Sequence, residues 1–502
     1  MKRKKKRKRK ILTGIACFFC MAFLCTACGA DKKEAEKEIP TIRIMAWSAG
    51  HTNENQELDL VNEALGDLTQ KKIGCRLELV YPSNTLDYRL LLGSKEKMGN
   101  QADIVGMYGG TYESYLKEGY LMRLDPYIEE YGDGILETLG CEREELRIKG
   151  YKGEEGIYGI PKAMPEIHIK GVVVRTDLLE KYGFSLDDVK KMEDLEPFLE
   201  CIAKNEEISP IVPTAMMGGF FVNENLDLVD SAGAIAVREK GDSLEIENFF
   251  ETSEFESYAK MMKRWREKGI LSNQIGREDE LGLNLVVAGK AAATELIIRP
   301  DEVEEWKGIY GDTITIKEFD MKPFMTTRHK WRYNWFVNSE CKYPELAIQA
   351  LNLMYTDSGV NNLMLYGVEG KHYIVDKDGF FSYPEGINQE NVGYFTNEKW
   401  QFYRKIAGLW KGMSANQKQE MEKFNHSAVY SPIYGFILDE SSIKEEIKQI
   451  GKVIDQFFYS VQLGFGEGEE SLREFQEKLK EAGIDRVKEE VKNQIQQWKA
   501  KY

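Results

Sequence analysis

Histidine is scarce in this chain of 502 residues, and the five that occur are isolated from one another. The sequence contains no H-x-x-x-H or H-E-x-x-H pair, which would place two imidazoles on one helix face as zinc ligands. It also lacks the G-x-S-x-G turn that exposes the nucleophile of α/β-hydrolases. We therefore predict no catalytic residues, no metal and no cofactor. Two carboxylates suffice for a glycosidase, and such a pair has no characteristic spacing in sequence. A secreted glycan-active enzyme therefore stays as the alternative.

Cysteine is also rare beyond the amino-terminal segment. Two C-x-x-C spacings, at 17–20 and 25–28, lie in that segment, where cysteine acts as a small apolar residue. The remaining cysteines are widely scattered and have no metal-ligand spacing; they are Cys75, Cys141, Cys201 and Cys341. Export would permit disulfides, but the sequence does not say which of them form, if any. We favour buried free thiols.

A long uncharged apolar run occurs near the amino terminus. Residues 1–10 hold nine Lys or Arg and no acid, and residues 11–27 (ILTGIACFFCMAFLCTA) follow without a charge. This order is typical of a secretory signal rather than of a spanning helix. Thr26-Ala27-Cys28 resembles a lipobox, although Cys25 stands where that pattern prefers leucine. We expect cleavage before Cys28 and acylation of its sulfur, with an uncleaved anchor or ordinary secretion as alternatives. Two acyl chains would hold the protein stably at the extracellular face of the cell membrane.

The charge balance argues against nucleic acid as a partner. Without the nine basic residues of 1–10, the formal charge of -15 becomes -24. So acidic a chain repels phosphate on average. Residues 28–40 are charged and lack apolar anchors, so we interpret them as a flexible tether.

Folded structure is predicted to begin directly after the tether, in an alternating β and α order. Strands are predicted at 41–47, 75–81 and 102–108, with helices at 57–73 and 86–97 between them. A β-α-β-α-β order favours a parallel sheet covered by helices. The total length is too great for one ordinary core, which indicates two lobes.

The stretch 153–177 (GEEGIYGIPKAMPEIHIKGVVVRTD) is predicted to be an extended connection between those lobes. Gly156, Gly159 and Pro161 disfavour a helix, and β-branched residues follow. A capped helical turn then runs from Thr176 to Gly183.

This passage resembles the first crossover of the family 1 extracellular solute-binding proteins of carbohydrate ABC transporters. Further passages of the family are matched in order along the chain. They are Tyr115–Ile128 with its G-Y-L-x-x-L-D-x-Y-I pattern, Gly289–Ala293 (GKAAA), Asn334–Met354 with Pro344 opening a helix, and Leu365–Tyr373 (LYGVEGKHY). The last is similar to a signature of lipoproteins in this family that carry an extended carboxyl-terminal region.

The resemblance implies an α/β, two-lobed periplasmic-binding-protein-like fold with hinge crossovers and a C-terminal helical extension. We expect a first lobe at 41–158, a second lobe at 159–325, and a return crossover with the extension at 326–502. It implies an oligosaccharide ligand, delivery to the permease subunits of an ABC transporter, and lobe closure without any bond being broken. We expect a monomer.

A sugar needs aromatic faces to stack on and polar groups to orient its hydroxyls. Ligands of open α/β sheets sit at the carboxyl ends of strands, which directs the search for such residues. The candidates are Trp47, Ser48, His51, Tyr108, Tyr112, Glu166, His168, Arg328, Trp331, Tyr333, Trp335, Glu369, His372 and Tyr373.

Two other features are predicted to be structural. Trp265 lies on a helical stripe of apolar residues in 253–268, which is typical of core packing. Asp376-Lys-Asp-Gly379 begins like a calcium loop, but Phe380 occupies the next ligand position. We favour a D-G turn between two strands there, and leave calcium dependence open.

Overall fold

The computed structural model describes the chain from Ile39 onward with gaps between elements. The described residues are 39–46, 56–82, 102–108, 112–150, 152, 154–162, 168–212, 225–241, 243–271, 282–298, 303, 306–307, 310–320, 322–331, 333–388, 391–394, 396, 401–402, 404–411, 416–465 and 469–501. Pro40–Tyr502 forms one compact unit with two principal sheets, each within a hydrophobic core of its own. None of the helices described in it is long and apolar enough to cross a membrane.

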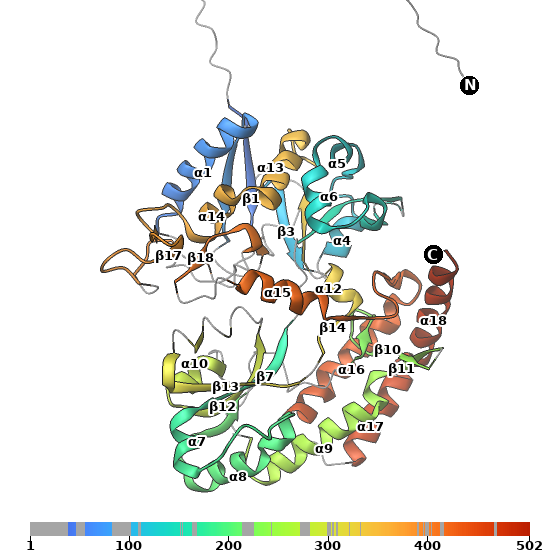
Figure 1. The fold of residues 1–502 in the computed structure, drawn as a ribbon. Helices are drawn as coiled ribbons and strands as arrows, with labels where there is room; N and C mark the ends of the chain where they lie inside the picture. Colours follow the sequence, from blue (N-terminus) through green and yellow to red (C-terminus); the bar gives the residue numbers. More distant parts are fainter. Residues whose placement is uncertain are drawn as a thin grey trace, which may run out of the picture. The chain divides into compact units, whose positions relative to one another are not determined.

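The first sheet has the strand order β2-β1-β3-β15-β6 (Figure 1). Its strands are β1 (Thr41–Met45), β2 (Arg76–Val80), β3 (Ile104–Tyr108), β6 (Gly159–Pro161) and β15 (Tyr333–Val337). β2, β1 and β3 are parallel, as the β-α-β-α-β order predicts, whereas β15 runs antiparallel to both of its neighbours. A strand from late in the chain therefore completes the first sheet.

Helices from both halves of the chain pack in the core of the first sheet. α1 (Leu58–Ile73) contacts β2 and also α14 (Ser358–Tyr366), while α13 (Pro344–Thr356) contacts α5 (Asp125–Tyr131) and α6 (Asp133–Leu139). Their buried apolar residues belong to one cluster with those of β1, β3 and β15. We call this sheet and its helices the first lobe.

The second sheet has the order β13-β7-β12-β8. Its strands are β7 (Ile169–Arg175), β8 (Ser209–Val212), β12 (Ala291–Ile298) and β13 (Ile314–Glu318), and its helices are α7 (Thr176–Tyr182), α8 (Glu196–Asn205), α9 (Ser253–Glu267) and α10 (Gly282–Val287). A small antiparallel sheet of β9 (Asp227–Leu228), β10 (Ile235–Lys240) and β11 (Ser243–Asn248) shares the same core. We call these elements the second lobe.

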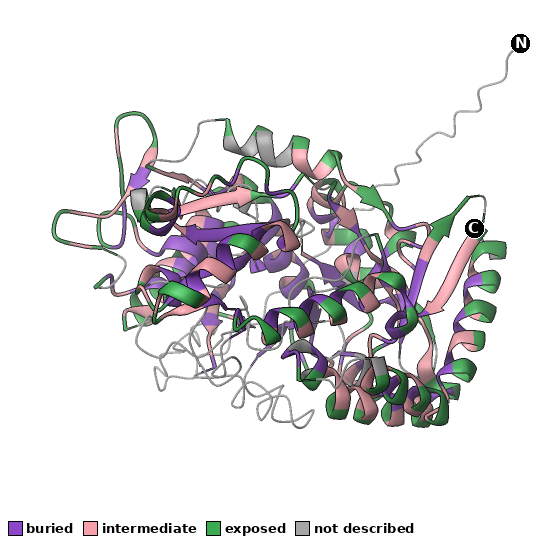
Figure 2. Cartoon of the chain, turned by 90° about the horizontal axis from the view of Figure 1, so that it is seen from below, coloured by how far each residue is buried: buried purple, intermediate pink, exposed green. Residues whose placement is uncertain are grey.

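Three helices near the carboxyl terminus pack into the core of the second lobe. They are α16 (Lys444–Gln462), α17 (Glu469–Glu481) and α18 (Ile484–Lys501). α16 contacts α9 and α18 contacts β11, and each helix buries one apolar stripe, including Phe475 and Val487. Along the helix that leads to the carboxyl terminus, Figure 2 shows exposed and intermediate residues, which is the pattern of an amphipathic helix on a lobe surface.

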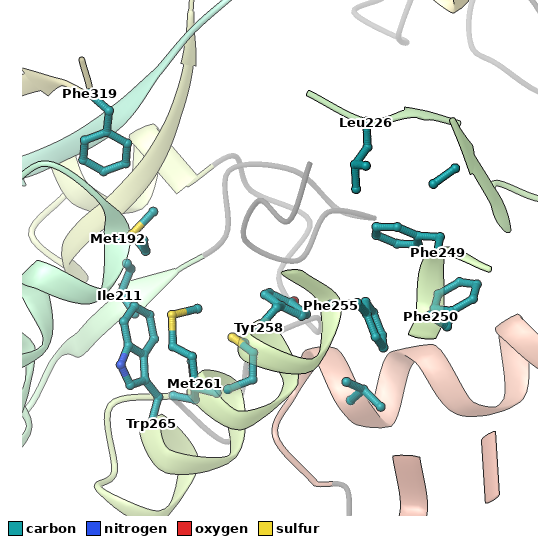
Figure 3. Close-up of a cluster of buried hydrophobic side chains, with 14 of the residues drawn as sticks. Met192, Ile211, Leu226, Phe249, Phe250, Phe255, Tyr258, Met261, Trp265 and Phe319 are labelled. Atoms are coloured by element: carbon teal, nitrogen blue, oxygen red, sulfur yellow. The ribbon is translucent and has the colours of Figure 1, made fainter. Parts of the chain in front are cut away.

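Trp265 lies in the core, as its place on a helical stripe predicts. Its side chain on α9 is fully buried, and its indole Nε1 donates a hydrogen bond to Glu196 at 2.9 Å. In Figure 3 the labelled side chains of α9 face Ile211 at one end and Phe249 and Phe250 at the other. Helix α9 is therefore an internal support of the second lobe.

The two cores divide the chain differently from the expected segments. β6 at 159–161 belongs to the first sheet, and 333–410 supplies a strand and two helices to the first core. Residues 433–498 contribute to the second core. The segment 326–502 is thus shared between the lobes, because strand pairing and packing join residues that are far apart in sequence.

The D-K-D-G stretch forms a turn, as favoured above. It joins β16 (Ile374–Val375) to β17 (Phe380–Ser382) in an antiparallel hairpin. The side-chain oxygen Oδ1 of Asp376 accepts hydrogen bonds from the backbone N–H groups of Asp378 and Phe380, at 2.9 Å each. This carboxylate oxygen stabilises the turn, in the manner of an Asx turn.

Candidate ligand-binding site

The first connection between the lobes lies in the stretch predicted to be a hinge. β6 pairs with β15 of the first sheet, and the backbone N–H of Lys162 donates a hydrogen bond to the backbone carbonyl of Tyr333 at 3.2 Å. By Ile169 the chain has entered β7, which pairs with β12 of the second sheet. The interpretation of this stretch as a crossover between two lobes is confirmed.

Close packing explains one of the glycines in the connection. A Cβ at Gly159 would lie 2.5 Å from the ring of Phe336 on the adjacent strand. A larger residue would push β6 away from β15, so glycine is required at this position.

Two further connections return between the lobes. One runs from β13 through β14 (Phe324–Met325) and α12 (Thr327–Trp331) into β15. The other runs from β18 (Leu409–Trp410) through α15 (Gln417–His426) to β19 (Val429–Tyr430) and then into α16. β14 and β19 pair in parallel, so these two connections form one two-stranded ribbon. Figure 1 shows α12, α15 and β14 as this crossing group of elements.

Several predicted binding residues lie outside the described residues. Trp47, Ser48, His51 and Glu166 belong to this group, and so does the lipidation candidate Cys28. The backbone of Tyr108 ends β3 and that of Trp331 ends α12, but their side chains are not described. The roles of these residues stay predictions.

The aromatic candidates on β15 are buried within the first lobe. Trp335 is 1% exposed, stacks on Phe402 with ring centroids 5.9 Å apart, and meets Tyr333 edge-on at 5.4 Å. Tyr333 packs over Gly106 and its hydroxyl donates to Gln401. Tyr112 is likewise buried, with its ring 4.8 Å from that of Phe336. These three aromatic side chains pack the core of the first lobe, and their burial leaves no ring face for a sugar.

The candidates within Leu365–Tyr373, which we call the signature loop, divide into buried and exposed residues. Tyr373 is buried and stacks on Phe381 at 4.3 Å, and burial raises its pKa to about 12. His372 is 1% exposed and hydrogen-bonded to Glu57 of the first lobe. Glu369 is exposed, so among these three it is the one whose side chain solvent reaches.

The two remaining candidates lie on the connections. His168 directly precedes β7 and is half-buried. Arg328, on α12, donates from Nη2 to the backbone carbonyl of Asp230, while much of the residue stays exposed. Both therefore sit where the chain passes between the lobes, and their roles in binding stay predictions.

Sequence reasoning missed the buried carboxylate of Asp227, which accepts hydrogen bonds from Thr327 in the connection that runs through α12. An aspartate inside an apolar stretch was the available signal, since a buried carboxylate requires hydrogen-bond partners. Within the part of the chain that the structure describes, no group of three or more His, Cys, Asp or Glu side chains could hold a metal ion.

Comparison with known proteins identifies relatives along most of the chain. The chain is 24% identical over 482 residues to a carbohydrate ABC transporter substrate-binding protein of Streptococcus pneumoniae, covering 93% of this chain and 92% of the relative. Residues 432–500 match a family described as a domain of unknown function, DUF3502. This match covers most of α16–α18. The resemblance to solute-binding proteins of carbohydrate transporters is thereby confirmed.

Solved structures show the same fold. The N-glycan transport solute-binding protein NgtS of S. pneumoniae aligns with a TM-score of 0.74 at 20% identity, covering 91% of this chain and 98% of that one. The same protein in complex with Man5GlcNAc aligns with a TM-score of 0.69. The alginate-binding protein AlgQ2 without calcium ion aligns at 0.62 with 14% identity, covering 92% and 98% of the two chains. The two-lobed solute-binding-protein fold is therefore established for this chain.

Proposed function

We propose that this protein captures an oligosaccharide outside the cell and delivers it to the permease of an ABC transporter. It acts by binding and lobe closure and breaks no bond in its ligand. It is a monomer that acylated Cys28 holds at the extracellular face of the cell membrane, and it binds no nucleic acid.

One observation carries the proposal: two α/β lobes joined by three connections, in a chain similar over 93% of its length to a carbohydrate ABC transporter substrate-binding protein. Such connections let two lobes rotate about a common hinge and enclose a ligand. The structural neighbours include a protein solved with Man1GlcNAc and with Man5GlcNAc, which supports an oligosaccharide as the ligand class.

The ligand is held by residues that follow the strand ends and line the connections. Trp47 and Trp331 supply aromatic faces, with Tyr108 as a third ring. Ser48, His51, Glu166, His168, Arg328 and Glu369 supply polar groups that orient hydroxyls. Aromatic faces contribute most of the affinity, because hydrogen bonds to a sugar largely replace hydrogen bonds to water.

Calorimetric titration of the soluble form that begins at Gly29 tests this function. A panel of mannose- and N-acetylglucosamine-containing glycans, maltooligosaccharides and acidic oligosaccharides is titrated, and each glycan is recovered for mass spectrometry. Saturable one-to-one binding with every glycan recovered intact is the expected result. Shortened glycans would instead identify a glycan-active enzyme, and absence of heat with every oligosaccharide would contradict the proposed ligand class.

A further inference from the structure

The carboxyl ends of the parallel strands in the first sheet lie at the edge where the chain passes between the lobes. Tyr108, the last residue of β3, pairs with Tyr333, the first residue of β15. Asn334 pairs with Pro161, the last residue of β6, so the chain leaves and re-enters the first sheet at this edge. Because β1, β2 and β3 are parallel, the residues that follow β1 and β2 lie along the same edge. Ligands of open α/β sheets bind at such an edge.

Tyr81 directly follows β2 at this edge and is half-buried. Its hydroxyl lies 3.4 Å from the hydroxyl of Tyr394, which is buried. The Tyr394 hydroxyl donates a hydrogen bond to the backbone carbonyl of Met364 on α14 at 2.6 Å. Because the one hydroxyl hydrogen of Tyr394 is directed at this carbonyl, Tyr81 is the donor in the contact between the two tyrosines. Any further hydrogen bond of the Tyr81 hydroxyl is therefore one that it accepts.

Glu57 is placed near Tyr81 by the two consecutive residues Gly393 and Tyr394. The backbone N–H of Glu57 donates a hydrogen bond to the backbone carbonyl of Gly393 at 2.9 Å. A Cβ at Gly393 would lie 2.4 Å from Oε2 of Glu57, so the carboxylate packs directly on this backbone. Since Tyr394 contacts Tyr81 and its neighbour Gly393 contacts Glu57, both side chains belong to one part of the edge.

The carboxylate of Glu57 is an ionised acceptor that solvent reaches. Its side chain is 32% exposed, and its two oxygens lie 2.9 Å from Nζ of Lys371 and 2.9 Å from Nε2 of His372. The hydrogen bond from Lys371 is the main cause that lowers the pKa of Glu57, and the one from His372 acts in the same direction. An ionised carboxylate has about four acceptor positions and no donor, so these two contacts leave room for others.

We propose that Tyr81 and Glu57 form an acceptor pair that binds the hydroxyl groups of a neutral sugar unit and disfavours a unit that carries a carboxylate. This inference rests on the proposed function and adds the charge of the ligand to it. Sugar hydroxyls donate hydrogen bonds, which two acceptors can receive. A carboxylate at the same place would set a second negative charge beside Glu57. Lys371 offsets this charge only in part, because its ammonium is already paired with Glu57.

Titration calorimetry with matched glycan probes tests this assignment. Each neutral glycan that the parent binds is compared with its derivative in which the primary hydroxyls are oxidised to carboxylates. The parent should bind the neutral form at least about tenfold more tightly. Tyr81→Phe, which keeps the packed ring, should weaken binding of the neutral form about five- to tenfold. Glu57→Gln should also weaken it, and should narrow the preference for the neutral form to about threefold or less.

Two matched controls come from the first lobe: Tyr127→Phe, at a half-buried tyrosine of α5, and Asp378→Asn, at an exposed acid of the β16–β17 turn. Both should bind like the parent. If Glu57→Gln does not fold, Tyr81→Phe decides the outcome. Parent-like binding by Tyr81→Phe and Glu57→Gln would overturn the acceptor pair and leave the proposed function intact. A preference for the oxidised form that Lys371→Gln removes would also overturn it, and a parent that binds no glycan would overturn both proposals.

Discussion

The imidazole of His372 joins the signature loop to the first helix through Glu57. Its Nε2 lies 2.9 Å from a carboxylate oxygen of Glu57, and its Nδ1 lies 2.8 Å from the backbone nitrogen of Val368. Because that backbone nitrogen can only donate, Nδ1 accepts and the ring hydrogen resides on Nε2. A Cβ at Gly367 would lie 2.5 Å from Nδ1, so glycine at this position leaves room for the ring. The signature loop is thus attached to the first lobe through His372 and Glu57.

Neutral His372 should make stability depend on pH. Burial lowers its pKa below the ordinary value of 6.5, so the unfolded chain takes up the proton first as pH falls. The contribution is complete above about pH 6.5 and declines below it, by at most about 1.4 kcal/mol per pH unit. Urea unfolding at several pH values measures this dependence.

A variant pair isolates the histidine. His372→Gln should lower the free energy of unfolding at neutral pH by about 1 to 3 kcal/mol, because the backbone donor of Val368 loses its acceptor. It should also flatten the pH dependence below about pH 6.5 relative to the parent. His426→Gln, at an exposed histidine, is the control and should match the parent in both respects. An unchanged slope in His372→Gln would contradict the neutral buried imidazole.

Trp265→Ala should destabilise the second lobe by about 3 to 5 kcal/mol, since the fully buried indole would leave a cavity. It would also remove one hydrogen-bond donor to Glu196. The Arg264 guanidinium, together with Lys268 and the indole, lowers the pKa of Glu196 to about 2. Trp265→Phe keeps most of the volume and should cost less. Thermal unfolding followed by circular dichroism measures both variants, and equal midpoints for Trp265→Ala and the parent would show that the indole does not support the core.

Local patterns predicted the first strands and first helix of the first lobe and the core-facing helix α9 of the second, while the helix predicted at 86–97 lies outside the described residues. The order β1, α1, β2, β3 follows from alternating and helical periodicities within one short stretch, and the stripe on α9 follows in the same way. The place of β15 could not be predicted, because its pairing with β3 and β6 depends on contacts between distant segments. Its aromatic residues look like a strand end in sequence, yet the sheet buries them on both faces.

The binding-site residues were also hard to predict, because their burial depends on contacts between segments that are distant in sequence. Residue type and strand ends select aromatic residues, but they cannot tell an exposed ring from one such as Trp335 that packs on Phe402. His372 was selected for its polar ring, whereas its two ring nitrogens are both used inside the first lobe. Asp227 could not be recognised from the sequence, because its hydrogen-bond partner Thr327 comes from a later connection between the lobes.

Cys28→Ala should release the protein from membranes or leave it unprocessed. The basic segment, the apolar run and the small residues before Cys28 are the order that lipoprotein processing requires, and alanine offers no thiol for acylation. Membrane fractionation with immunoblotting distinguishes the parent from the variant. A variant that stays membrane-bound at the mature size would contradict the lipid anchor.

Trp47→Ala and Trp331→Ala should each weaken oligosaccharide binding by about 1 to 3 kcal/mol at little cost in stability. A neutral sugar offers no charge to bind, and its hydroxyls gain little from replacing water. Burying an apolar ring face against an indole is the larger contribution, at about 25 cal/mol per Å². Trp47 follows β1, at the carboxyl end of a parallel strand, and Trp331 ends α12 on the second connection.

Matched tryptophan variants separate binding from packing. Titration calorimetry and thermal unfolding are measured together for Trp47→Ala, Trp331→Ala and Trp335→Ala, the last removing an indole that is buried in the first lobe. Trp335→Ala should lose stability by about 3 to 5 kcal/mol. If the first two variants bind like the parent, or lose stability as Trp335→Ala does, then Trp47 and Trp331 pack the fold and the sugar is held elsewhere.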